Sequence, residues 1–100
     1  MILANLAGGV KLLRIESSES KLGKYRAIFE HKGEKRGVIF GKDGNYLDTQ
    51  DEEEKQEWIQ KNLTKAVAKP MTKQALVRWI TWNKKTLEES TRDFKRRFNI

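Results

Sequence analysis

The spacing of apolar residues in the first half of the chain is that of β-strands. Residues 24–31 alternate between apolar and polar side chains, which is the period of a half-buried strand. A second apolar run at residues 36–40 follows a short turn around Gly33, and two such runs predict a β-hairpin. Residues 10–16 predict a shorter first strand. The expected inner face of the hairpin's first strand is Tyr25, Ala27 and Phe29.

After a glycine-rich turn at residues 41–45, the apolar residues recur at helical spacing. Thr49 and Glu52 have the spacing of a capping box, and the acidic residues that follow suit the positive end of a helix dipole. This predicts a helix that begins near Thr49 and continues to about residue 63. Its expected apolar stripe is Trp58, Ile59 and Leu63.

Two further helices are predicted beyond Pro70, which disfavours helical backbone in the residue before it. Thr72 is expected to cap the second helix, and Thr86 with Glu89 forms a capping box for the third. Residues 83–85 separate these two helices. Their expected buried faces are Ala75, Leu76, Trp79 and Ile80 in one, and Leu87, Thr91, Phe94 and Phe98 in the other.

The order of these elements predicts an α+β fold. A strand and a hairpin are followed by about three short helices, which are expected to pack on one face of a small antiparallel sheet. The length of 100 residues suits a single domain over residues 1–100, and no repeat or linker divides the chain. Since 35% of the residues are charged and 37% are hydrophobic, the core is expected to be small.

The inventory of reactive side chains is poor. The chain has no cysteine, which fits a reducing compartment, and its one histidine is His31, at a predicted strand end. No spacing matches a phosphate-binding loop, and Asp43, Asn45 and Asp48 lack the glycine and the closing glutamate of a calcium loop. We therefore expect no enzymatic activity, no metal, no cofactor and no small-molecule substrate.

The apolar start of the chain, residues 1–9, is too short for a helix that spans a membrane. It is expected to be a first strand or a tail that docks on a partner.

The net charge of +7 is unevenly distributed. Residues 48–57 contain six carboxylates against one lysine, a local charge of −5, so the remaining residues carry +12. Such a field attracts polyanions or acidic protein surfaces. The basic residues expected to contact them lie at the hairpin tip, before the third helix and on that helix: Lys32, Lys35, Arg36, Lys84, Lys85, Arg92, Lys95, Arg96 and Arg97.

Trp79 and Trp82 lie three residues apart on the predicted second helix. They are expected to be core residues, because a small core needs its aromatic side chains. The alternative is a platform on which nucleic-acid bases stack.

A set of short motifs extends over residues 24–98. They are Phe40-Gly41, Asp48-Thr49 with Asp51, Trp58, Met71-Thr72, Ala75-Leu76, Arg78-Trp79-Ile80, Trp82-Asn83, Thr86-Leu87 and Phe94-Lys95-Arg96-Arg97-Phe98. Together they resemble a family of small basic proteins of unknown function that large DNA viruses of algae and protists encode, including chlorella viruses. The chain departs from this pattern at residues 60–63, where the family has a basic, histidine-containing stretch, and at residues 64–69, where it has a tryptophan-bearing loop.

This resemblance implies a structural role in a virion. The expected function is that of a minor capsid protein that bridges larger capsid proteins, located in the virion and, during assembly, in the host cytoplasm. The alternative is a nucleic-acid-binding module that contacts the phosphates of DNA through its basic C-terminal helix.

Overall fold

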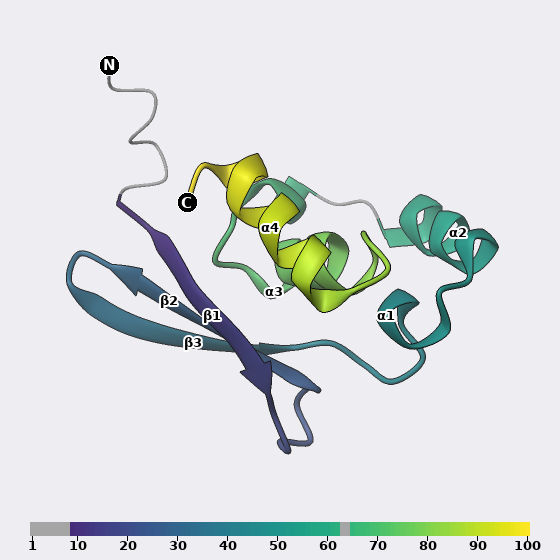
Figure 1. The fold of residues 1–100 in the computed structure, drawn as a ribbon, viewed down its shortest axis with the longest axis horizontal. Coiled ribbons are helices and arrows are strands. Elements are labelled where there is room, and N and C mark those ends of the chain that lie inside the picture. Colours follow the sequence, from purple (N-terminus) through teal and green to yellow (C-terminus); the bar gives the residue numbers. More distant parts are fainter. Residues whose placement is uncertain (1–8, 63–64) are drawn as a thin grey trace.

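The computed structural model describes residues 9–62 and 65–100, and within them three strands precede the helices (Figure 1). The strands pair in the order β1-β2-β3, and both pairs are antiparallel. This confirms the predicted α+β class. The elements are β1 Lys11–Ser17, β2 Tyr25–His31, β3 Glu34–Phe40, α1 Tyr46–Thr49, α2 Glu52–Asn62, the 3-10 turn η2 Lys65–Ala68, α3 Lys73–Leu76, the π-helical turn η3 Val77–Thr81 and α4 Leu87–Phe98.

The predicted hairpin is formed by β2 and β3, with a tighter turn than the sequence indicated. Lys32 and Gly33 are its two central residues, and both have positive φ angles, 54° and 79°. Turns of this kind match the twist of the two strands. As a result, β3 begins at Glu34, two residues before the predicted start.

Strand β1 contains an irregularity and lies at one edge of the sheet. Its pairing with β2 shifts register between Leu12 and Arg14, which leaves Leu13 unpaired in the ladder. A bulge of this kind bends a strand and increases its twist. Strand β3 forms the other edge.

The core lies between the sheet and the helices. Ala27 and Phe29 on β2 are fully buried, and the Phe29 ring packs against Phe94 of α4 with 6.4 Å between centroids. Leu76 and Ile80 complete the same cluster from the second helical segment. The α3–η3 segment and α4 lie over one face of the sheet, as predicted, whereas α2 lies beyond its end (Figure 1).

The start of the first long helix differs from the prediction. Gln50 adopts a left-handed backbone and ends the short helix α1, which the sequence did not predict. The chain therefore turns again, and Asp51 caps α2 by accepting a hydrogen bond from the backbone of Glu54. The capping box at Thr49 and Glu52 was thus wrong. Glu52 instead accepts a hydrogen bond from the Tyr46 hydroxyl, at 2.9 Å.

The caps of the two later helical segments agree with the sequence. Thr72 accepts a hydrogen bond from the backbone of Ala75, and Thr86 accepts one from Glu89 while donating to the Glu89 carboxylate. The second segment is not one regular helix, since α3 passes into η3 at Val77. Insertions of π type are frequent at functional sites.

Replacement of Thr86 with alanine should lower the free energy of unfolding by about 1 kcal/mol, because the first turn of α4 loses its side-chain acceptor. Urea unfolding followed by circular dichroism measures this loss. Thr49→Ala is the matched control and should have a smaller effect, since Thr49 is not the cap of α2. Equal effects of the two changes would contradict this assignment of the caps.

Candidate functional site

The three cations of the hairpin tip, Lys32, Lys35 and Arg36, are exposed. Lys35 lies opposite Glu30, and Arg36 lies opposite Phe29. Since neighbouring residues of a strand point to opposite faces, Arg36 projects on the side that carries the helices and Lys35 on the other side. The hairpin tip thus presents positive charge in two directions.

The cations of α4 differ in their surroundings. Arg92 and Lys95 are exposed and form no ion pair in the described part of the chain. Arg96 is 80% exposed but lies 3.8 Å from Asp93. Arg97 is held more firmly, because it pairs with Asp93 at 3.2 Å and its guanidinium lies 3.6 Å from the centre of the Trp79 ring.

Lys84 and Lys85 lie in the loop before α4, next to α1 and α2. The Gln50 side chain donates a hydrogen bond to the Lys85 carbonyl, and Lys55 of α2 donates to the Asn83 carbonyl. Lys84 and Lys85 are both exposed. The fold therefore places these two cations away from the hairpin tip, which lies on the opposite side from α2 (Figure 1).

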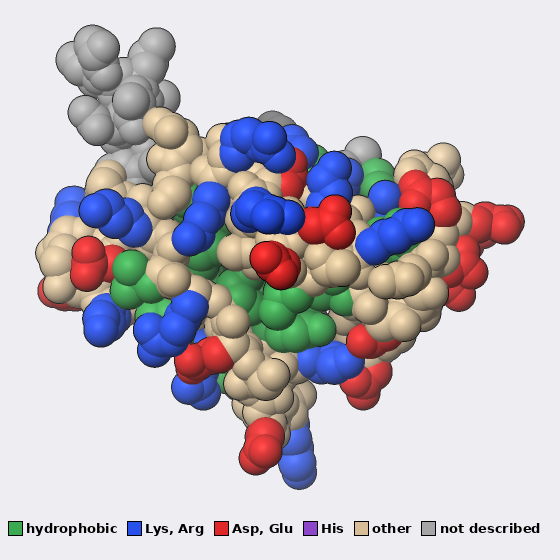
Figure 2. Space-filling model, in the orientation of Figure 1, with side chains coloured by type: hydrophobic (Ala, Val, Ile, Leu, Met, Phe, Trp, Pro, Cys, Tyr) green, Lys and Arg blue, Asp and Glu red, His purple; other side chains and the backbone are tan. Residues whose placement is uncertain are grey.

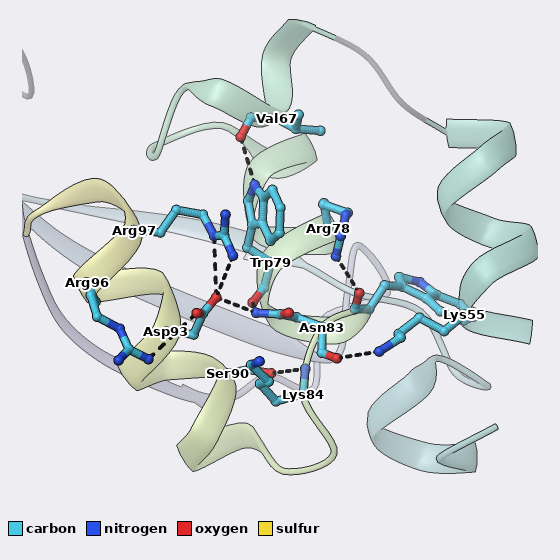
Figure 3. A network of polar contacts seen from close by, with 11 residues as sticks. Lys55, Val67, Arg78, Trp79, Asn83, Lys84, Ser90, Asp93, Arg96 and Arg97 are labelled. Atoms are coloured by element: carbon cyan, nitrogen blue, oxygen red, sulfur yellow. Dashed lines mark hydrogen bonds and ion pairs between the residues drawn. The ribbon is translucent and has the colours of Figure 1, made fainter. Parts of the chain in front are cut away.

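Asp93 of α4 is the centre of a polar network that joins this helix to Asn83, in the loop before it (Figure 3). It accepts a hydrogen bond from Asn83 at 2.7 Å and from Arg97 at 3.2 Å. Burial raises the pKa of Asp93, but the hydrogen bond from Asn83 and the charge of Arg97 outweigh burial, and the pKa lies below its usual value. Asp93 therefore holds a full negative charge that neutralises part of the basic helix.

Trp79 is partly buried, and two guanidinium groups contact its ring. Arg97 lies 3.6 Å and Arg78 lies 3.9 Å from the ring centre, and Figure 3 shows them on either side of the indole. The indole nitrogen donates a hydrogen bond to the Val67 carbonyl. With its ring contacted by two arginines and its polar atom used, Trp79 packs at the edge of the core and leaves no platform for a base.

Arg78 is partly buried, unlike the exposed cations of α4. Burial and the nearby charge of Arg97 lower the pKa of Arg78. Its Nη1 donates to the Trp82 carbonyl at 2.7 Å, whereas its buried Nε has no hydrogen-bond partner in the described part of the chain.

Trp82 has a different environment and lies at the wall of a cleft. Its ring stacks on Trp58 of α2 with 5.2 Å between centroids and 6° between the planes. The cleft has a volume of about 570 Å³ and lies between α2, α3 and the loop after β3. It is lined by Leu22, Gly41, Lys42, Asp43, Asn45, Trp58, Lys61, Asn62, Lys73, Gln74, Val77 and Trp82.

The polar residues of the loop after β3 have structural partners. Asn45 caps α1, and the Asp48 carboxylate accepts hydrogen bonds from Gly44 and from Lys24, at 2.8 and 2.9 Å. The hydrogen bond from Lys24 holds the pKa of Asp48 below its usual value. These contacts account for side chains that superficially resemble a calcium loop.

The side chains of the described residues also bear on two other classes of site. Within 9–62 and 65–100, no group of three or more His, Cys, Asp or Glu side chains is placed to hold a metal ion. In the same part of the chain, no helix has the length and apolar character needed to cross a membrane. The docking tail predicted at residues 1–9 falls, except for Gly9, outside the described residues.

Comparison of the chain with family models, with curated proteins and with solved structures found no match. The resemblance to small basic viral proteins therefore stays a prediction.

Proposed function

We propose that the chain is a non-enzymatic structural protein of a virion, a minor capsid component that docks on acidic surfaces of larger capsid proteins. The observation that carries this proposal is the excess of unpaired positive charge. Within the described residues, seven of the nine predicted contact cations form no ion pair, whereas Arg96 and Arg97 share Asp93. The seven are Lys32, Lys35, Arg36, Lys84, Lys85, Arg92 and Lys95.

The separation of charge along the molecule supports a bridging role. The acidic side chains of α2, among them Glu53, Glu54 and Glu57, are exposed at one end (Figure 2). At the other end, the hairpin tip carries Lys32, Lys35 and Arg36 beside Glu30 and Glu34 (Figure 1). A module with one acidic end and a basic surface elsewhere can contact two surfaces of different charge at once. In this proposal the protein resides in the virion, and in the host cytoplasm during assembly.

Amine-reactive cross-linking of purified particles, followed by mass spectrometry, tests this role. Cross-links from Lys32, Lys35 or Lys95 to a larger capsid protein are expected, at sites flanked by carboxylates on that protein. Absence of the chain from purified particles would contradict the proposal. Co-purification with the genome alone, after the shell has been removed, would favour the second candidate below.

Nucleic-acid binding is the second candidate, and the geometry of α4 favours it. Arg92 and Arg96 are four residues apart, about one helical turn, so both lie on the outer face opposite the buried Phe94. Lys84 and Lys85 lie just before the same helix and are exposed as well. Cations so arranged can contact successive phosphates of a strand.

Simultaneous replacement of Arg92, Lys95 and Arg96 with glutamine should weaken binding to a labelled duplex regardless of its sequence. The plot of log affinity against log salt has a negative slope, and this slope should become shallower by about one unit for each phosphate that α4 no longer neutralises. Titrations at low and near-physiological salt measure this slope. An unchanged slope would show that α4 does not contact phosphates. Lys11→Gln, on β1, is a control for the removal of charge alone.

A further inference from the structure

The cleft beside the Trp58 and Trp82 rings has the size of a small-ligand site. Its volume of about 570 Å³ lies in the range of pockets that hold one small molecule or nucleotide. The two parallel rings form one wall. In a stack of two rings each has only one face covered by its partner, so a further flat ring can extend the stack.

The charge of the cleft is positive. Three lysines line it, Lys42, Lys61 and Lys73, and none of them forms an ion pair in the described part of the chain. The one carboxylate in the lining, Asp43, is directed to Lys24 at 3.4 Å. A ligand with a flat apolar ring and attached negative charge would complement these walls.

Three residues of the cleft lining carry hydrogen-bond donors that the fold does not use. In the described part of the chain, the indole N–H groups of Trp58 and Trp82 have no acceptor, in contrast to the N–H of Trp79. Gln74, which also lines the cleft, is exposed. Polar groups of this kind can bind the edge of a base, which is rich in acceptors and donors.

We infer that this cleft binds one unstacked nucleobase of a single-stranded nucleic acid, with the adjoining phosphates on Lys42, Lys61 and Lys73. A base within a duplex has both faces covered by its neighbours and its pairing edge occupied, so it does not fit this site. A base site goes beyond the capsid role and rests on the second candidate function, nucleic-acid binding. It implies that the protein prefers single-stranded to double-stranded nucleic acid.

The experiment compares a labelled strand of twelve thymidines with an abasic strand of the same length and charge, at near-physiological salt. The thymidine strand should bind roughly 5- to 150-fold more tightly, the range expected for one stacked base. Trp82→Leu should abolish this difference while leaving the affinity for the abasic strand unchanged. Quenching of tryptophan fluorescence by the thymidine strand alone is an independent readout on the unaltered protein.

Three further variants separate the effect of the cleft from effects on the fold and of α4. Because the Trp58 and Trp82 rings also attach α2, Trp82→Phe is included as a variant that keeps an aromatic ring; it should retain part of the difference. Lys61→Gln with Lys73→Gln leaves the stack intact and should weaken binding of both strands. Lys11→Gln removes an exposed charge outside the cleft and should change the binding of neither strand.

The outcomes distinguish the base site from the function on which it rests. If the protein binds the two strands with equal affinity, and the variant with glutamine at Arg92, Lys95 and Arg96 binds neither, the base site is overturned. Phosphate binding by α4 would then still stand. Absence of binding to either strand would overturn both. A capped decaglutamate peptide that binds as tightly as the thymidine strand, and no longer binds after Trp82→Leu, would assign the cleft to an acidic protein segment.

Discussion

Replacement of Asp93 with alanine is expected to lower the free energy of unfolding by about 2 kcal/mol, because the buried Asn83 amide loses the carboxylate that accepts its hydrogen bond. The Asp93 side chain is only 12% exposed and holds Arg97 and Asn83. Without it, Arg78 and Arg97 remain next to the same Trp79 ring, and Arg97 has lost its carboxylate partner.

The same change should alter the dependence of stability on pH. The pKa of Asp93 in the folded protein lies below its usual value of 3.8, so its stabilising contribution is complete above about pH 4 and is lost as the pH falls through the folded-state pKa. The alanine variant should therefore lose less stability than the original protein on acidification. Urea unfolding at pH 7 and at pH 3 measures both effects. Glu88→Ala, an exposed acid on the same helix, is the control, and an equal loss there would contradict the role of Asp93.

Replacement of Phe94 with alanine should lower the free energy of unfolding by about 3 to 5 kcal/mol. Phe94 is fully buried and packs on Phe29 of the sheet and Phe98 of its own helix. Small domains have total stabilities of about 5 to 15 kcal/mol, so a large part of the margin would be lost.

Thermal unfolding by differential scanning calorimetry measures the loss at Phe94. Leu22→Ala is the control, because the Leu22 side chain is 70% exposed and its removal should change the stability little. A Phe94 variant as stable as the Leu22 variant would mean that α4 does not hold the sheet.

The sequence predicted those parts of the fold that depend on local patterns. Alternation along β2 identified Ala27 and Phe29 as the inner face, and the spacing of Thr86 and Glu89 identified the start of α4. The left-handed residue Gln50 had no such signal, because glutamine carries no preference for that conformation. The consequent helix α1 and the shifted cap of α2 were therefore missed.

The candidate site was only partly predictable for a related reason. The basic residues could be selected by type, and all nine of them are exposed. Their partners depend on packing between distant residues, such as Arg97 on Trp79 and Trp58 on Trp82, which no period in the sequence encodes. For the same reason Trp79 and Trp82 were predicted to share one role, whereas the fold assigns them two.

The two edges of the sheet limit how copies of this protein can meet. Strand β1 carries a bulge at Leu13, and the charged side chains of Lys35 and Arg36 lie on β3. Bulges and edge charges both discourage a strand of another molecule from joining the ladder. Even at high concentration, the protein should therefore resist fibril formation, and copies that meet should contact one another through side chains and not through a shared backbone sheet.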